Sequence, residues 1–411
     1  MATRTLQRII ATTDVHSALD TATTGMLAHL HSLKATSLIA DCGDFFEGTG
    51  YYHLGKGQLE REVLRDLYDV LAPDNHGWLH YFEPALHAMT VCANTVHEAD
   101  GSPLFNRLRI VRIKGRRVAV TAVIGPQAFN SIPAHQRAGH RVTDPARALR
   151  ELMLEHHHRT DAWIVLSHSG FTEDLKLAAA CPFTDVIFAG HCHSDIYGPI
   201  NVGDTLVLKG AELGAGYATA EAIPGGWGAR TTRFPRTNHM PEHLAVLAEK
   251  IAFTGRTLSA VLGTVNEPYR GTLLDRGLLL REITQRLNTG LGADAVLLNE
   301  TVLRPIQLGD RLTLADLLAI EPFDNQLVHA HLPDRHRGHL DGLLAKLTEQ
   351  AGPLVLAPRP LPDSTKTVLT TDYLANTFLG GRTHQAGLRL GQAVRRVIAT
   401  PLPQTPQEAE R

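Results

Sequence analysis

The segment TTDVHSALD, residues 12–20, decides the fold of this chain. It overlaps the end of a short apolar run, Arg8–Thr13, that is typical of a buried β-strand. Asp14 and His16 come directly after the predicted strand. In layered α/β proteins the loops at strand ends build the binding sites. The segment therefore predicts an α/β fold whose chemistry begins at these two residues.

Four further polar segments repeat this arrangement, and three of them again follow predicted strands. They are Gly43-Asp44 after Ser37–Asp41, Asn75-His76 in the loop 73–77, Ser167-His168 after Ala162–Leu166, and GHCH with His191 and His193 after Val186–Ala189. All offer nitrogen or oxygen donors, which suit divalent Mn, Zn, Fe or Mg. A single histidine near a strand end is more often a hydrogen-bonded structural residue. Five segments in this order instead predict a centre for two divalent ions, with Asp44 as the bridging carboxylate.

The rest of the chain indicates a two-domain organisation. The other strands predicted in the first half are Thr90–Asn94, Arg109–Lys114, Val118–Ile124 and Thr205–Lys209. Helical patterns separate many of the strands, which favours sheets covered by helices. A length of 411 residues suits two domains better than one. We expect a catalytic domain over 1–235, a connector helix over 236–262, a second α/β domain over 263–400 and a disordered tail over 401–411.

The composition argues against two classes of partner. A formal net charge of −2, from 40 basic and 42 acidic residues, gives no basic excess for a nucleic-acid polymer. No apolar run approaches the length of a membrane span, so the expected ligand is a small molecule. The four cysteines form no CxxC pair, and the short polar start before Ile9 is unlike a signal peptide. Both points favour a cytoplasmic protein, while the oligomeric state stays open.

The order DxH, GD, NH, H, GHxH resembles the calcineurin-like metallophosphoesterases. Within them, TTDVHSALD, DCGDFFEGTG (41–50), YDVLAPDNHG (68–77), VLSHSG (165–170) and FAGHCHSD (188–195) resemble the 5′-nucleotidase branch. LLNETVLRP (297–305), EPFDNQLV (321–328) and DYLAN (372–376) resemble that branch's C-terminal nucleotide-binding domain. The resemblance covers about residues 8 to 395. It implies a four-layer α/β/β/α sandwich followed by a smaller α/β substrate-binding domain.

The resemblance also implies roles for particular residues. One ion would be held by Asp14, His16, Asp44 and His193, and the other by Asp44, Asn75, His168 and His191. His76 matches the family's catalytic histidine. The residues that match its substrate-binding set are Arg270, Asn299, Arg304, Phe323 and Tyr373, of which the two aromatic residues would form the walls of a base-stacking slot.

These features predict a phosphatase that hydrolyses the phosphate monoester of a nucleoside 5′-monophosphate or a modified nucleotide. The attacking group would be a hydroxide that bridges the two ions. The alternatives with the same chemistry are a 2′,3′-cyclic-nucleotide phosphodiesterase with 3′-nucleotidase activity and a nucleotide-sugar hydrolase. A catalytically weak nucleotide-binding sensor is an alternative of another class. Hydrolysis of a sulfur compound is less favoured, because it would leave the aromatic pair without a purpose.

Two positions depart from the resembled family. Leu79 stands where the family has an acid that orients the catalytic histidine and keeps it protonated, and Asp74 substitutes for that acid only if the loop folds differently. Arg382 stands where the family has an acid that contacts the ribose hydroxyls. The first departure questions the strength of His76 as an acid. The second favours a modified nucleotide, a deoxy sugar or a more anionic substrate.

Overall fold

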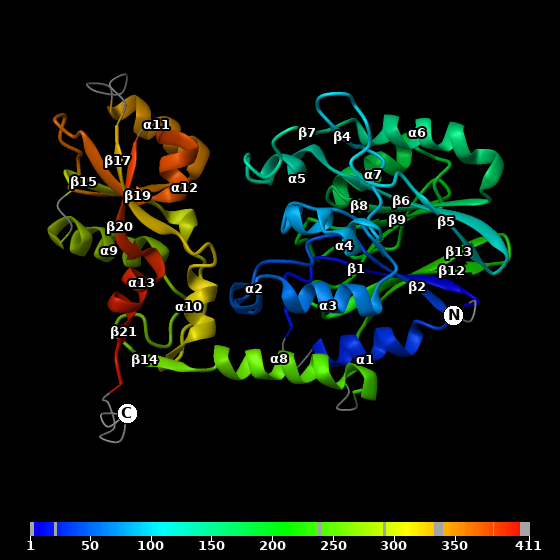
Figure 1. Ribbon diagram of the computed structural model, residues 1–411, viewed down its shortest axis with the longest axis horizontal. Coiled ribbons are helices and arrows are strands. Elements are labelled where there is room, and N and C mark those ends of the chain that lie inside the picture. Colours follow the sequence, from blue (N-terminus) through cyan, green and yellow to red (C-terminus); the bar gives the residue numbers. More distant parts are fainter. Residues whose placement is uncertain are drawn as a thin grey trace. The chain divides into compact units, whose positions relative to one another are not determined.

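The computed structural model describes residues 4–19, 23–236, 240–290, 293–332, 340–380 and 382–402. Most of the tail predicted to be disordered lies outside these residues. The chain divides into two compact units, Met1–Gly255 and Arg256–Arg411, here called unit 1 and unit 2. Unit 1 runs from blue to green in Figure 1 and unit 2 from green to red. Within the described residues, no helix combines the length and apolarity that crossing a membrane requires.

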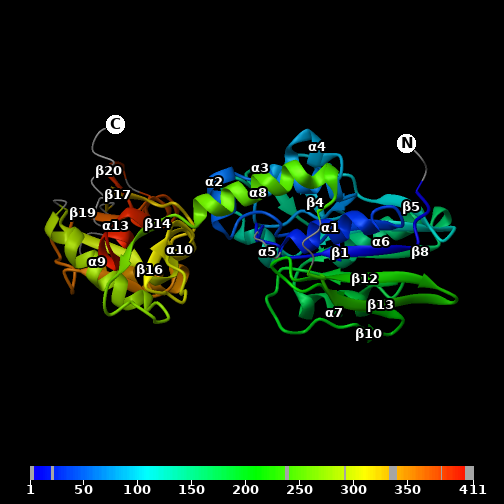
Figure 2. The same cartoon turned by 90° about the horizontal axis from the view of Figure 1, so that it is seen from below.

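Unit 1 contains two main β-sheets. The first has the order β13 (Gly226–Arg233), β12 (Gly216–Ile223), β1 (Arg8–Thr12), β2 (Ser37–Asp41) and β3 (Val70–Leu71). The second has the order β10 (Ile200–Val202), β11 (Thr205–Lys209), β9 (Val186–Ala189), β8 (Ala162–His168), β6 (Arg116–Ile124) and β5 (Arg109–Ile113). A small third sheet pairs β4 (Thr95–His97) with β7 (His140–Val142). Figure 2 shows β12 and β13 as a long antiparallel hairpin.

Helices cover the outer faces of both main sheets. Alternate residues of a strand point to opposite sides of the sheet, so apolar residues on the outer side are buried by the helices. Ile9 and Ala11 pack between the sheets, whereas Ile10 packs against the helices on the outer side. The helices of unit 1 are α1 (Thr23–Leu33), α2 (Gly50–Gly55), α3 (Gln58–Leu67), α4 (Pro84–His87), α5 (Pro126–Ser131), α6 (Pro145–His156) and α7 (Phe171–Ala180), together with most of α8 (Ala245–Leu258), whose last turn belongs to unit 2. α1, α3 and α8 pack on the first sheet, and α6 and α7 on the second. The predicted four-layer α/β/β/α arrangement is confirmed.

Parallel pairing sets the position of the site. Strands β1, β2 and β3 are parallel to one another, as are β6, β8, β9 and β11. Their carboxyl ends therefore carry the polar segments singled out in the sequence. The prediction of a strand over Thr90–Asn94 is wrong. Its successive amides bond to three different neighbours, Leu71, Asn106 and Ala122, so no continuous ladder forms.

Unit 2 has a sheet with helices on both faces. Its five strands have the order β18 (Leu354–Ala357), β15 (Ala295–Asn299), β19 (Thr367–Thr371), β17 (Gln326–His331) and β20 (Thr383–Arg389). A smaller sheet joins β16 (Arg311–Thr313), β14 (Val261–Val265) and β21 (Ala399–Thr400). The helices are α9 (Arg276–Gly290), α10 (Leu314–Ile320), α11 (Leu340–Ala351), α12 (Asp372–Leu374) and α13 (Leu390–Ile398). α9 and α13 pack on one face of the larger sheet, and α11 packs on the other.

Candidate active site

The seven residues proposed as metal ligands lie at the carboxyl ends of strands from both main sheets of unit 1. Asp14 and His16 follow β1, Asp44 follows β2, Asn75 follows β3, His168 ends β8, and His191 and His193 follow β9. The two sheets bring these segments together. The His191 backbone amide donates to Asp14 Oδ1 at 3.0 Å, although 177 positions separate the two residues.

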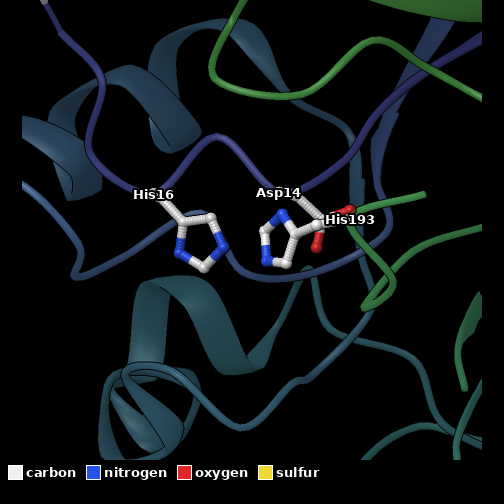
Figure 3. A group of neighbouring side chains, drawn as sticks. All are labelled: Asp14, His16 and His193. Atoms are coloured by element: carbon white, nitrogen blue, oxygen red, sulfur yellow. The ribbon is translucent and has the colours of Figure 1, made fainter. Parts of the chain in front are cut away.

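Within the part of the chain that the structure describes, three overlapping groups of side chains have ligand atoms within 4.8 Å of one another. They are Asp14, His16 and His193; His16, Asp44 and His76; and Asp44, His168 and His191. Figure 3 shows the first group, in which the three side chains lie next to one another. His16 and Asp44 each belong to two of the groups, and of the two only the Asp44 carboxylate has two oxygens with which to bridge a pair of cations.

Asp44 is a buried carboxylate whose oxygens face different imidazoles. Its Oδ1 lies 3.2 Å from His168 Nε2, and its Oδ2 lies 3.7 Å from His16 Nε2. Burial alone would raise the pKa of Asp44, but His168 and the neighbouring histidines hold it well below its ordinary value. The carboxylate is thus charged and requires positive charge beside it.

His168 is oriented by the protein so that one nitrogen faces the site. Its Nδ1–H donates to the Cys42 carbonyl at 2.8 Å, and its Nε2 lies 3.1 Å from Asn75 Oδ1. Burial would lower the pKa of His168, but the charge of Asp44 raises it to about 10. In the metal-free protein the imidazole is therefore protonated at neutral pH.

Two other histidines have nitrogens that fit a metal ion. His16 Nε2 and His191 Nδ1 are buried and have no hydrogen-bond partner among the described residues. Burial lowers the pKa of both residues to about 4, so both imidazoles are neutral and carry a free lone pair. A buried polar atom without a partner is unfavourable. A cation bound at each nitrogen satisfies it, and the surrounding donor set of imidazole, carboxylate and amide oxygen suits such ions.

The loops after β1 and β2 are joined by their backbones. The Asp14 amide donates to the Gly43 carbonyl at 2.9 Å, and the His16 amide to the Asp44 carbonyl at 2.8 Å. Asp14, His16 and Asp44 all have left-handed backbones, with φ of 50°, 49° and 54°. Such strain costs about 1–3 kcal/mol per residue. A Cβ at Gly43 would lie 2.5 Å from Nδ1 of His168, so the close approach of the loop requires glycine.

Glu47 contacts His76 in the way that the missing acid at position 79 was expected to. Its Oε2 accepts from His76 Nδ1 at 3.1 Å, and its Oε1 accepts from the Gly77 amide at 3.1 Å. Burial lowers the pKa of His76, but the bond to Glu47 and the charge of Asp44 raise it to about 9. Glu47 was not among the site residues predicted from the sequence. Its position in the segment DCGDFFEGTG was the available signal, but the separation of 29 positions between Glu47 and His76 concealed the pairing.

Asp74 does not replace the acid that is missing at position 79. It is fully buried, and its Oδ2 accepts from the Asp44 amide at 2.6 Å and from the Tyr81 hydroxyl. Leu79 lies in a 3₁₀ turn, Trp78–Phe82, and is 53% exposed. Asp74 therefore supports the Asp44 loop, and the acid in contact with the imidazole of His76 is Glu47.

The residues proposed to bind substrate lie in unit 2 and differ in their accessibility. Phe323 is 50% exposed, and the guanidinium of Arg304 lies over its ring, with the central carbon 5.5 Å from the ring centroid. Tyr373 is 51% exposed and meets Phe378 edge to face at 5.8 Å between centroids. Both proposed walls of the slot are thus accessible. Arg382 has an exposed side chain, while its carbonyl accepts from the backbone of β17.

Two of the proposed substrate residues are engaged within the protein. Asn299 is buried, and its Nδ2 donates to Thr301 Oγ1 at 2.5 Å and to the Ala351 carbonyl at 3.1 Å. Arg270 donates from Nε to the Val265 carbonyl at 3.0 Å. Unit 2 therefore brings Arg304 and Phe323 into direct contact, whereas Asn299 and Arg270 are held by other partners.

Glu321 holds the loop that presents Phe323. Its Oε1 accepts from both the backbone amide and the side-chain amide of Asn325, at 3.1 and 2.8 Å. Burial raises the pKa of Glu321 to about 7. On the same loop, Asp324 has a left-handed backbone with φ of 55° and forms an ion pair with Arg389. The loop is anchored on both sides of the exposed ring.

Comparison with known proteins gives the fold of the whole chain. No family model matches. A 5′-nucleotidase precursor of Thermus thermophilus superposes with a TM-score of 0.71 at 19% identity, over 95% of each chain. The 5′-nucleotidase of Candida albicans has a TM-score of 0.67 at 14% identity, over 97% of this chain and 99% of that one. The sulfate thiohydrolase SoxB of Thermus thermophilus has a TM-score of 0.65 at 20% identity, over 93% and 81%.

Two curated relatives match parts of the chain. Protein 5NUC of Lutzomyia longipalpis is 26% identical over 39% of this chain and 30% of its own length. The uncharacterized metallophosphoesterase YunD of Bacillus subtilis is 36% identical over 15% of this chain and 13% of its own length. The matched segments thus span less than a third of either relative. The fold expected from the resemblance to two-domain 5′-nucleotidases is confirmed by the solved structures.

We predict that metal binding releases protons. His168 has a pKa of about 10 without a metal, yet only the neutral imidazole ligates a cation. Titration of Mn²⁺ into the metal-free protein at pH 7 should therefore release about one proton or more. Calorimetry in two buffers of different ionisation enthalpy measures this number. A binding heat that is the same in both buffers contradicts the prediction.

Proposed function

We propose that this chain is a metal-dependent phosphatase that hydrolyses the phosphate monoester of a nucleoside 5′-monophosphate or a modified nucleotide. The observation that carries the proposal is the position of Asp44, a buried carboxylate whose oxygens face His168 and His16. Further nitrogen and oxygen donors surround it. The 5′-nucleotidases that share the fold support the same class of reaction for this chain.

The proposal assigns two divalent ions to the centre. One would be held by Asp14, His16, Asp44 and His193, and the other by Asp44, Asn75, His168 and His191. Mn, Zn, Fe and Mg all suit these donors. When bound, such a pair neutralises the charge of the phosphoryl group and provides hydroxide at neutral pH. The unpaired nitrogens of His16 and His191 support this assignment.

In this proposal His76 acts on the phosphoryl group or the leaving oxygen. Its Nδ1 is engaged by Glu47, so Nε2 is the nitrogen free to donate. The pKa of about 9 keeps the imidazole protonated at neutral pH. A protonated donor stabilises negative charge as it develops and supplies a proton to the departing oxygen. Glu47 fixes the ring by accepting from Nδ1 and is itself held by the Gly77 amide.

The substrate in this proposal carries a base or another flat group. The exposed rings of Phe323 and Tyr373 provide stacking surfaces, and Arg304 adds positive charge beside the first. Stacking accepts different bases because each has a π face. Arg382, in place of an acid, supports a modified or more anionic nucleotide.

Several alternatives are separated by assay. A 2′,3′-cyclic-nucleotide phosphodiesterase and a nucleotide-sugar hydrolase would use the same centre on a different ester. The sensor alternative is weakened by Glu47, since His76 keeps a carboxylate partner despite Leu79. A cytoplasmic location stays part of the proposal, and the four free cysteines support a reducing compartment.

We predict that phosphate release from nucleotides depends on Asp44. The purified protein with added Mn²⁺ should release phosphate from at least one nucleoside 5′-monophosphate or modified nucleotide. Asp44→Asn should reduce the rate to that of protein treated with a chelator, because one amide oxygen cannot bridge two cations. A malachite-green assay over 5′-, 3′- and 2′,3′-cyclic nucleotides and nucleotide sugars measures this. Bound metal without turnover of any ester would instead support the sensor.

We predict that Glu47→Gln lowers kcat and moves the alkaline limb of the pH–rate profile to lower pH. Loss of the carboxylate lowers the pKa of His76, so the protonated form is lost earlier as pH rises. The rate loss should stay within the about 10²- to 10⁴-fold that a positioned acid contributes. Bound cations act on both proteins alike, so the difference between their pH profiles is the measurement.

Glu83→Gln is the matched control for this variant. Glu83 accepts from His80 Nδ1 at 2.8 Å, so the chain offers a second Glu–His pair outside the proposed centre. We expect its alkaline limb to match that of the wild type. Equal profiles for all three proteins would contradict the function proposed for Glu47.

We predict that Phe323→Ala weakens nucleotide binding without affecting the chemical centre. Loss of one stacking surface is worth about 1–3 kcal/mol per base, which corresponds to a rise in KM of about 5- to 150-fold. Hydrolysis of glycerol phosphate, which has no base, should be unchanged. Leu278→Ala, another partly exposed apolar position in unit 2, is the control. Parallel losses on both substrates would exclude a base-stacking function for Phe323.

A further inference from the structure

A fully buried lysine lies at the end of β11, beside the loop that carries two of the proposed ligands. Lys209 Nζ lies 2.7 Å from the Cys192 carbonyl, 2.7 Å from the Ser194 carbonyl and 2.5 Å from Glu212 Oε1. An ammonium group has three donors, and here each has one acceptor. The ring of Tyr197 lies 5.2 Å from Nζ at its centroid. The charge is thus completely satisfied inside the protein.

The same ion pair extends to His193. Glu212 uses its second oxygen, Oε2, to accept from His193 Nδ1 at 2.6 Å. A carboxylate that accepts from one imidazole nitrogen fixes the ring and leaves the other nitrogen with its lone pair. The His193 ring stacks against His16 with centroids 5.2 Å apart, in the group that also contains Asp14.

Lys209 therefore acts on His193 in two ways. It bonds the carbonyls on either side of this residue, which fixes the backbone of the loop. It also neutralises Glu212, which holds the ring. On its other side the loop is fixed by the Phe171 amide, which donates to Cys192 Sγ at 3.1 Å. Packing alone does not explain a buried charge, since an apolar side chain of similar volume fills such a place at lower cost.

We propose that Lys209 and Glu212 are positioning residues that hold His193 as the ligand of one particular divalent ion, the one shared with Asp14 and His16. This inference rests on the proposed function. Under this proposal, the histidine ligands of the two ions are held in different ways. His168, a ligand of the other ion, is held by the neutral Cys42 carbonyl, whereas His193 depends on an ion pair. Damage to the ion pair should therefore affect one ion and spare the other.

Metal binding tests the selective part of the proposal. Wild type, Glu212→Gln and Lys209→Met are titrated with Mn²⁺ by calorimetry, and bound metal is counted by elemental analysis. Wild type should bind two ions. In Glu212→Gln one ion should bind as in the wild type and the other about 10- to 100-fold more weakly. In Lys209→Met that same ion should be weakened at least as much. Glu212→Gln keeps the shape of the side chain and serves if Lys209→Met does not fold.

Glu221→Gln is the matched control. Glu221, on β12, forms a Lys–Glu ion pair with Lys114 at 3.3 Å that is partly exposed and lies outside the proposed centre. It should bind two ions with unchanged affinity. Two ions bound with wild-type affinity in both test variants would overturn the proposal while leaving the proposed function intact.

Hydrogen exchange of the metal-free protein tests the anchoring part separately. Amides of the segment 190–195 should exchange faster in Lys209→Met than in the wild type, because the loop loses both carbonyl bonds. They should be unchanged in Glu221→Gln. Equal exchange in Lys209→Met and wild type would overturn the anchoring. If the wild type binds no metal, the proposed function and the assignment of His193 to an ion both fail, and faster exchange then supports the anchoring of the loop alone.

Discussion

A carboxylate buried among imidazoles is stable only with positive charge beside it, and the centre of unit 1 depends on this constraint at Asp44. Without a cation, His168 provides that charge as an imidazolium. His16 and His191 stay neutral because burial disfavours their charged forms. The four-layer core stabilises an arrangement that includes buried charge and left-handed backbone. Asp74 and Cys42 complete the support, the first by accepting from the Asp44 amide and the second by orienting His168.

Much of the fold and of the candidate centre was predictable because both have local signals. Apolar runs of strand length ended in Asp, His or Asn, and parallel strands place such ends together. The strands β1, β2, β8, β9 and β11 lie close to their predicted ranges for this reason. The strand prediction over Thr90–Asn94 was wrong because an apolar run indicates that residues are buried. It does not show that they pair with a neighbouring strand. The amides of this segment bond to three separate neighbours, which no local pattern reveals.

The residues that could not be predicted from the sequence make their contacts with residues distant in the chain or with the backbone of a neighbouring loop. Glu47 reaches His76 across 29 positions, and nothing at Leu79 indicated where a substitute acid would come from. Lys209 was expected only as the end of a strand, yet its ammonium group holds the loop of His193. Asn299 and Arg270 matched a motif, but their bonds to Ala351 and Val265 depend on packing within unit 2. A sequence motif identifies the position of a residue, whereas its hydrogen-bond partners depend on the fold.

The joined loops after β1 and β2 have a consequence for how such a centre can diversify. The amides of Asp14, His16 and Ser17 donate to the carbonyls of Gly43, Asp44 and Phe45. These peptide groups are the same whatever the side chains are. Donor atoms at 14, 16 and 44 can therefore be exchanged among residues that tolerate a left-handed backbone, such as Asp, Asn and His, while the main chain keeps its course. One scaffold of this kind offers descendants a route to new ion preferences by point substitution, with no loop to rebuild.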